Sequence, residues 1–198
     1  MKYRLSYTTL SRWERGESDT AIASYLGKPH PYPTPVMELG KAKHELWERE
    51  IKKTAQIPQE LGGGRLRAPI TERKHERLID VGDGHQIELV GVIDLEANGT
   101  LYDWKVSIRN VNAFAGSWQK QYYKLLIPEA KRFEFRAYNP ILETYGIAVC
   151  YLTDKDIDEG LEKVISLSTD FIATLEQMYG SAEKLDLLSK YKPQEAVV

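Results

Sequence analysis

The stretch from Gly91 to Ser107, which reads GVIDLEANGTLYDWKVS, constrains the fold more than any other part of the chain. At its centre, Asn98-Gly99 is the strongest short-range signal for a two-residue hairpin turn, because a type I′ turn needs positive φ at both central positions. Alternating β-branched and aromatic residues flank this dipeptide and predict two antiparallel strands. A two-residue loop fixes the register, so Asp94 is predicted to lie opposite Asp103.

The predicted register brings two carboxylates together on one face of the hairpin. Because side chains alternate along a strand, Lys105 shares the face of Asp94 and Asp103, whereas Trp104 points the other way. Like charges opposite each other are destabilising, and these carboxylates would be roughly 5 Å apart at Cβ. Two carboxylates with a lysine beside them are typical of a divalent-cation site. Without further motifs, two solvated residues flanking a turn would explain the pair equally well.

Composition places the chain among ordinary soluble proteins. Its 198 residues suit one domain with a substantial core, and 42% hydrophobic with 28% charged residues is a usual balance. The sequence has neither an apolar run of the ~20 residues needed for a membrane span nor a signal-peptide pattern at its start, so a cytoplasmic location is expected. The net charge of -2 gives no general attraction to nucleic acid. The only cysteine, Cys150, excludes an internal disulfide and fits a buried thiol better than a reactive one.

Periodicity and turn signals divide the rest of the chain into alternating helices and strands. The prolines in GKPHPYPTP and the glycines 62–64 mark loops. Helices are predicted at 6–15, 19–26, 37–54, 115–127 and, as a long amphipathic helix, at 157–179. Strands are predicted at 70–79, 86–96, 101–108, 133–138 and 145–153.

Two predicted helices carry further candidate site residues. Gly40 and His44 are four residues apart and share a helix face, as do Gln119 and Tyr123. An interior glycine costs ~1 kcal/mol against alanine, which suggests that another backbone or a ligand approaches Gly40 closely. Taken alone, His44 is more typical of a satisfied or exposed histidine than of a metal ligand.

Several charged residues around the hairpin have weaker signals. His75 and His85 are expected to face solvent. Glu96 shares a face with Asp94 and could touch a second metal, although solvation is the favoured reading, and Glu72 could accompany the site from a neighbouring strand. Basic residues that could contact a DNA backbone are Arg65, Arg67, Arg73, Lys74, Arg77, Arg109, Lys120 and Lys124. The aromatic residues Tyr102, Trp118 and Tyr122 could stack on unpaired bases, but core packing is favoured for each.

Four motifs in this order resemble the RecB-like branch of the PD-(D/E)XK nucleases. They are GKAKH at Gly40 to His44, GVID at Gly91 to Asp94, YDWK at Tyr102 to Lys105, and QKQYY at Gln119 to Tyr123. The opening LSYTTLSRWERG is a weaker match to that family's N-terminal helix. A lone D-x-K would carry no weight, whereas the ordered set is specific.

The resemblance implies a role for each motif residue. It implies that His44, Asp94, Asp103 and the main-chain carbonyl of Trp104 bind Mg²⁺ or Mn²⁺, and that Lys105 is the catalytic lysine. It also implies that two residues position the lysine or the DNA strand, namely Gln119 and Tyr123. Asp103 stands where the motif allows either aspartate or glutamate. Some relatives carry a four-cysteine iron-sulfur cluster, which a single cysteine cannot supply, so the resemblance is to exonucleases without one.

We therefore expect one α/β domain over residues 1–198, with a mixed central β-sheet flanked by helices as in the restriction-endonuclease-like core. Its expected parts are an N-terminal helical part at 1–36, a catalytic core at 37–153 and C-terminal helices at 154–190. The expected function is a metal-dependent DNA exonuclease that acts on single- or double-stranded ends in recombination, repair or phage DNA processing. Three alternatives stay open: a non-catalytic DNA-binding module, a restriction-type or structure-specific endonuclease, and a structural subunit of a recombination complex that docks through the long C-terminal helix. A recombination or repair partner and a homo-oligomer also stay open.

Overall fold

The computed structural model describes residues 2–30, 33–82 and 84–180. The chain divides into two compact units. The first contains the described residues of Met1–Pro31, Glu76–Val90 and Glu162–Val198, and the second those of Tyr32–His75 and Gly91–Leu161. Three elements contribute residues to both units, namely β2 (Ile70–Gly82), β3 (His85–Ala97) and α6 (Asp154–Tyr179). No helix in the described ranges is both long and apolar enough to cross a membrane.

The first unit begins with a strand that the sequence prediction missed, β1 (Lys2–Ser6). β1 pairs in parallel with β3, from Lys2 opposite Gln86 to Ser6 opposite Val90. Exposed and buried residues alternate along it, with Tyr3 fully buried, as expected for a strand with one solvated face. Its partner lies far away in the sequence, so the short alternation at the N-terminus could not be recognised as part of a sheet.

Two short helices follow β1 as predicted, α1 (Tyr7–Glu14) and α2 (Ser18–Tyr25). Ser6 caps α1, because its side chain accepts a hydrogen bond from the Thr9 N–H at 3.2 Å. Trp13 and Tyr25 both pack edge-on against Phe171 of α6. The aromatic residues Trp13 and Tyr25 therefore contribute to the packing of this unit.

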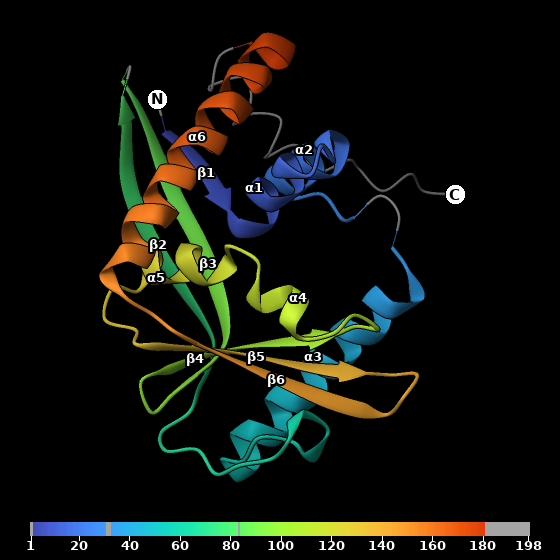
Figure 1. The fold of residues 1–198 in the computed structure, drawn as a ribbon. Helices are drawn as coiled ribbons and strands as arrows, with labels where there is room; N and C mark the ends of the chain where they lie inside the picture. Colours follow the sequence, from blue (N-terminus) through green and yellow to red (C-terminus); the bar gives the residue numbers. More distant parts are fainter. Residues whose placement is uncertain (1, 31–32, 83, 181–198) are drawn as a thin grey trace. The chain divides into compact units, whose positions relative to one another are not determined.

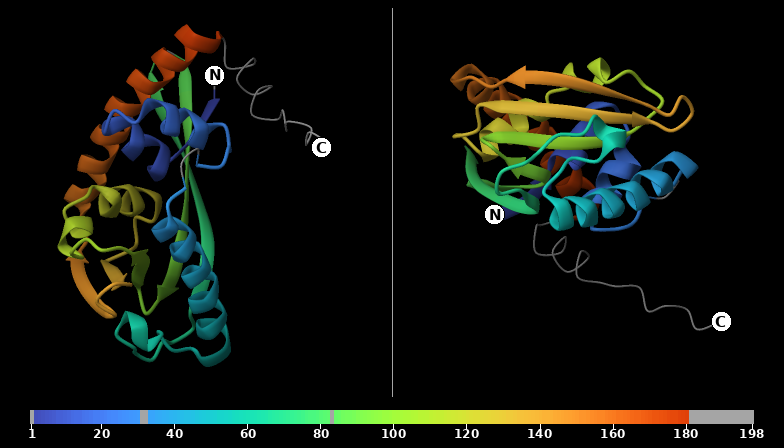
Figure 2. Two further views of the ribbon diagram at one scale, coloured as in Figure 1. Left: turned by 90° about the vertical axis from the view of Figure 1, so that its right-hand side faces the viewer. Right: turned by 90° about the horizontal axis from the view of Figure 1, so that it is seen from below.

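In the second unit, helices cover the strands β4, β5 and β6 (Figures 1 and 2). β5 pairs with β4 in parallel and with β6 in antiparallel orientation, while the end of β3 pairs with β4 in antiparallel orientation. The sheet runs in the order β1-β3-β4-β5-β6, with β2 on β3, so the predicted mixed sheet flanked by helices is confirmed. The remaining elements of this unit are α3 (Pro35–Thr54), η1 (Gln59–Leu61), β4 (Thr100–Val106), α4 (Asn112–Ala115), α5 (Gln119–Leu126), β5 (Arg132–Asn139) and β6 (Thr144–Tyr151).

The hairpin has the predicted turn and, close to the turn, the predicted register. Asn98 and Gly99 both have positive φ, 53° and 73°. The paired residues run from Ala97 opposite Thr100 to Leu95 opposite Tyr102 and end there. Asp94 and Asp103 are therefore not ladder partners, and this part of the prediction is wrong. The ladder stops because the Asp94 carboxylate accepts the backbone N–H of Trp104 (Oδ2–N 2.6 Å).

A second correction concerns the predicted helix at 115–127. The helix found there is α5, which begins at Gln119, whereas Ala115 is the last residue of the separate short helix α4 and residues 116–118 lie between the two. Gly116 ends α4, and the Ser117 hydroxyl donates back to the Phe114 carbonyl at 2.6 Å. The break lets α5 start at Gln119, which places that side chain at the first position of the helix. The other predicted helices and strands agree with the structure to within a few residues at their ends.

Each face of β4 and its neighbours packs against different elements. On one face, Trp47 and Ile51 of α3 and Leu61 of η1 form a cluster with Tyr102 and Trp104. On the other face, the Tyr123 ring of α5 stacks on Phe133. The single cysteine, Cys150 on β6, is buried as expected, and burial raises the pKa of its thiol.

Candidate active site

The end of the hairpin ladder brings Asp94 to the edge of α3. Asp94 Oδ2 is held by the Trp104 N–H, and its other oxygen, Oδ1, lies 3.6 Å from Nδ1 of His44 on α3. Burial alone would lower the pKa of His44, but contact with Asp94 and the charge of Asp103 raise it above its ordinary value. The structure thus brings His44 and Asp94 together, with Asp103 near enough for its charge to act on His44.

Asp103 is a buried carboxylate with two partners. Gln119 Nε2 of α5 donates to its Oδ1 at 2.7 Å, and Lys105 Nζ lies 2.7 Å from its Oδ2. Burial raises the pKa of Asp103, the nearby positive charge of Lys105 opposes that shift, and the negative charge of Asp94 adds to it. The net shift is upward. An additional positive charge near this carboxyl group would stabilise its ionised form.

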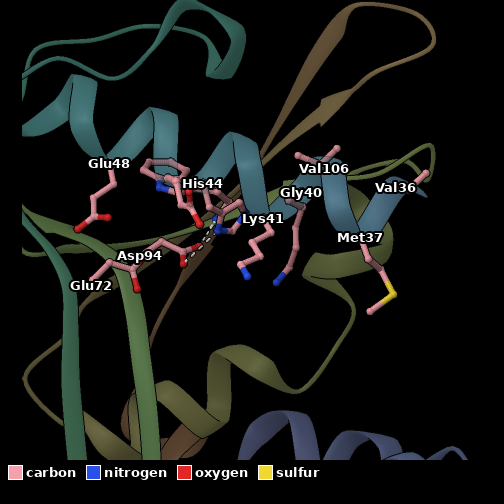
Figure 3. A pocket seen from close by; sticks show the side chains of 12 residues that line it. Val36, Met37, Gly40, Lys41, His44, Glu48, Glu72, Asp94 and Val106 are labelled. Carbon is pink, nitrogen blue, oxygen red and sulfur yellow. Dashed lines mark hydrogen bonds and ion pairs between the residues drawn. The ribbon is translucent and has the colours of Figure 1, made fainter. Parts of the chain in front are cut away.

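His44, Asp94 and Lys105 border an open cavity of about 630 Å³ between α3 and the hairpin (Figure 3). Asp103 does not line this cavity and adjoins it only through its contact with Lys105. One end of it is acidic, because Glu48 of α3 and Glu72 of β2 lie there beside Asp94. Burial raises the pKa of Glu72, and the charges of Asp94 and Glu48 raise it further. The other end is apolar, with Val36 and Met37 on α3 and Val106 on β4.

Sequence reasoning missed some of these lining residues. Glu72 was considered as a site residue from a neighbouring strand, and it lines the cavity. Glu48 and Lys41 were not considered, although Glu48 follows His44 by four residues and so shares its helix face. Lys41 and Glu48 lie three residues before and four residues after His44, and this helical spacing could have indicated that they share its face.

The two candidate residues on α5 have different contacts. Gln119 is buried and contacts Asp103 directly, so it supports a carboxylate of the site. Tyr123 Oη donates to the Val92 carbonyl at 2.8 Å, and its ring occupies the space above Gly91, where a Cβ would come within 2.8 Å of Tyr123 Cε1. These contacts hold β3 beside α5. The proposed role of either residue toward the lysine or DNA stays a prediction.

Other predicted surface residues have partners in the structure. His75 and Glu96 were expected to face solvent, but His75 Nε2 contacts Glu96 Oε1, and Arg73 lies 3.5 Å from the same carboxylate. Both side chains are only 16% exposed, so the expectation was wrong. The adjacent strands β2 and β3 bring these residues together across the sheet.

One of the basic residues considered for DNA contact is also internal. Lys124 is 4% exposed, and its Nζ donates to the carbonyls of Pro128 and Ala130 after the end of α5. Lys124 is therefore excluded as a backbone contact. Tyr102 and Tyr122 are buried, and Trp118 packs edge-on against Tyr122, in agreement with the favoured packing role for these aromatic residues.

The donor set fits a hard divalent cation. Asp94 adjoins the imidazole of His44, and the buried Asp103 Oδ2 has Lys105 Nζ as its partner at 2.7 Å. Oxygen-rich donor sets favour Mg²⁺ or Mn²⁺. Among the described residues, no group of three or more acidic, histidine or cysteine side chains is arranged so that it could hold a metal ion. A cation would therefore compete with His44 and Lys105 for the two carboxylates.

Comparison with known proteins gives similarity in structure but not in sequence. No family model and no curated protein matches the chain. The solved structure of SSO0001 aligns with a TM-score of 0.57 and 18% identity over 88% of this chain and 77% of its own. A proposed exonuclease from Eubacterium rectale aligns with a TM-score of 0.51 and 13% identity, over 97% of this chain and 93% of its own. An alkaline exonuclease from Laribacter hongkongensis aligns at 0.49 and 16% identity, over 92% and 94%. The chain has the fold shared by the first two structures.

Proposed function

We propose that the protein is a metal-dependent deoxyribonuclease, and specifically an exonuclease. The observation that carries this proposal is the contact of Asp94 with His44 and of Asp103 with Lys105, where His44, Asp94 and Lys105 line an open cavity. A buried carboxylate with raised pKa, a second carboxylate and a lysine at one point are the groups that phosphodiester hydrolysis needs. The ordered motifs and the fold shared with a proposed exonuclease support the same activity.

His44, Asp94, Asp103 and the main-chain carbonyl of Trp104 would hold Mg²⁺ or Mn²⁺. When bound, the cation would neutralise charge on the phosphodiester and lower the pKa of a water molecule. The cation would also restore the balance of charge around Asp103, whose burial raises its pKa. Gln119 would keep the Asp103 carboxylate in one orientation through its hydrogen bond to Oδ1.

Lys105 would act on the substrate. Its ammonium group, which lines the cavity beside Asp94, would contact a phosphate oxygen or the attacking water. Hydrolysis would join the water oxygen to phosphorus and break one phosphorus–oxygen bond of the backbone, with a proton transferred to the leaving oxygen. Lys41, on the same helix as His44 and at the same cavity, adds a second positive charge for the phosphate backbone.

The proposal is tested with linear DNA labelled at its 5′ or 3′ end and with covalently closed circles, each incubated with Mg²⁺, Mn²⁺ or EDTA. Degradation of the linear DNA from its ends, with closed circles left intact, supports the exonuclease. Nicking of closed circles would favour an endonuclease instead. Binding of DNA without cleavage in every metal would favour the non-catalytic alternatives and contradict the proposal.

A further inference from the structure

Gly40 of α3 is a glycine that neither backbone nor packing requires. It lies inside a helix, where glycine is destabilising relative to alanine. Its φ is not among the positive values found in this chain. A Cβ at this position would meet only Val106 Cβ, at 3.7 Å, which is an ordinary contact.

Other glycines of the same unit differ in this respect. At Gly160 of α6, a Cβ would lie 2.8 Å from the Gln121 carbonyl oxygen, and at Gly91 it would lie 2.7 Å from Leu126 Cδ1. Close packing within the protein therefore explains those two glycines. Gly40 has room for an alanine. Close approach of another part of the chain therefore does not explain the glycine, and the approach of a ligand is the remaining explanation.

What Gly40 does border is the cavity of the candidate active site. It lines the apolar end together with Val36, Met37 and Val106, and Figure 3 shows it between His44 and Met37 along α3. The cavity volume of about 630 Å³ is within the range of small-molecule sites. The cavity thus has a charged end, suited to a metal and a phosphate, and an aliphatic end. At the aliphatic end Gly40 leaves the backbone of α3 uncovered by a side chain.

We propose that Gly40, Val36, Met37 and Val106 form a subsite for the sugar and base of the single nucleotide next to the phosphate that is cleaved. This inference rests on the proposed nuclease function and specifies its substrate. A base whose face lies against an aliphatic wall cannot remain stacked and paired in a duplex, so the nucleotide must be unpaired or terminal. Trp104 is only 2% exposed, so its ring is not available for stacking on a base. The four subsite residues have no side-chain hydrogen-bond donor that would select one base.

The first test compares an alanine substitution at Gly40 with one at a helix position outside the cavity. Gly40→Ala removes a helix-destabilising residue, so the melting temperature should rise by about 2–4 °C, while the added methyl group should raise the KM for DNA about tenfold. Ser166→Ala is the control. It likewise replaces a residue of lower helix propensity with alanine, at an exposed position of α6 outside the cavity. This control should leave KM unchanged.

The second test measures binding without cleavage. In the presence of Mg²⁺, thymidine 5′-monophosphate should raise the melting temperature of the wild type more than inorganic phosphate does. That excess should shrink in Gly40→Ala and persist in Ser166→Ala. A wild-type KM together with a wild-type nucleotide effect in Gly40→Ala would overturn the subsite.

The two tests separate this inference from the proposed function. If the wild type cleaves DNA and Gly40→Ala changes neither KM nor nucleotide binding, the subsite fails while the nuclease stands. If no metal supports cleavage but the nucleotide effect is present and depends on Gly40, the nuclease fails while the subsite is supported as a nucleotide-binding site.

Discussion

Gln119 Nε2 donates a hydrogen bond to Asp103 Oδ1 across 2.7 Å, and both side chains are buried. Because Gln119 is the first residue of α5, the break between α4 and α5 determines where this amide lies. The contact makes Gln119 a positioning residue for the carboxylate, since it acts through Asp103.

Gln119→Ala should therefore weaken the site without touching the substrate. Loss of the hydrogen bond leaves Asp103 free to rotate, and we expect a 10- to 100-fold loss of metal affinity or activity. A Mg²⁺ titration of DNA cleavage measures this as a higher metal concentration at half-maximal rate. Gln121→Ala is the control, because Gln121 lies on the same helix but contacts Glu159 at 3.3 Å. Equal metal dependence in Gln119→Ala and the wild type would exclude the positioning role.

Asp103→Asn and Lys105→Ala should each abolish cleavage, but with different effects on stability. Lys105→Ala leaves a buried carboxylate without its counter-charge and should lower the free energy of unfolding by about 1–3 kcal/mol. Asp103→Asn removes that charge and should leave the fold intact. In the double variant, stability should return toward that of Asp103→Asn while activity stays absent. Urea unfolding and cleavage assays together check this, and wild-type cleavage by either single variant would refute the assigned roles.

Features that depend on neighbouring residues in the sequence could be predicted well. Asn98-Gly99 determines its turn and the three closest pairs by local backbone preference, and Ser6 caps α1 through a side chain three residues from its partner. The motif residues His44, Asp94 and Asp103 could also be selected, because each stands in an ordered motif. His44 and Asp94 line one cavity and Asp103 contacts Lys105 of the same cavity, while the roles of these residues stay predictions.

Features that depend on distant partners could not be predicted. The ladder ends at Leu95 because the Asp94 side chain takes a backbone N–H, a competition that register arguments ignore. His75 has the charged surroundings of a surface strand, and only its pairing with Glu96 on the neighbouring strand removes it from solvent. The cavity beside Gly40 is formed by residues of both α3 and β4. The role of the glycine could therefore not be inferred before these two elements were placed together.

Tyr123→Phe tests how β3 is held beside α5. The lost hydrogen bond to the Val92 carbonyl should cost about 1 kcal/mol of unfolding free energy. In Tyr123→Phe the ring still fills the space above Gly91. Tyr123→Ala removes the ring as well, so it should lower the unfolding free energy by more, about 3–5 kcal/mol. Chemical denaturation of both variants gives the two values. A stability unchanged in Tyr123→Phe but a large rise in KM for DNA would point instead to a direct role in holding the DNA strand.

Glu60 provides a prediction for the pH dependence of stability. A hydrogen bond from Lys43 to Glu60 lowers its pKa below the ordinary 4.5, and a second one from Trp47 adds to this. A carboxyl group whose pKa is lower in the folded state stabilises the fold above its unfolded pKa, and this contribution is lost as the pH falls through the folded value. The side chain is 40% exposed, so solvent screening limits the contribution to less than about 1 kcal/mol. Glu60→Gln should therefore lower the unfolding free energy slightly at pH 7, and the difference from the wild type should disappear in the acid range below the lowered pKa. Urea titrations of both proteins from pH 7 downward measure it, and a difference that stays constant throughout would show that packing of the side chain, and not its charge, stabilises the contact between η1 and α3.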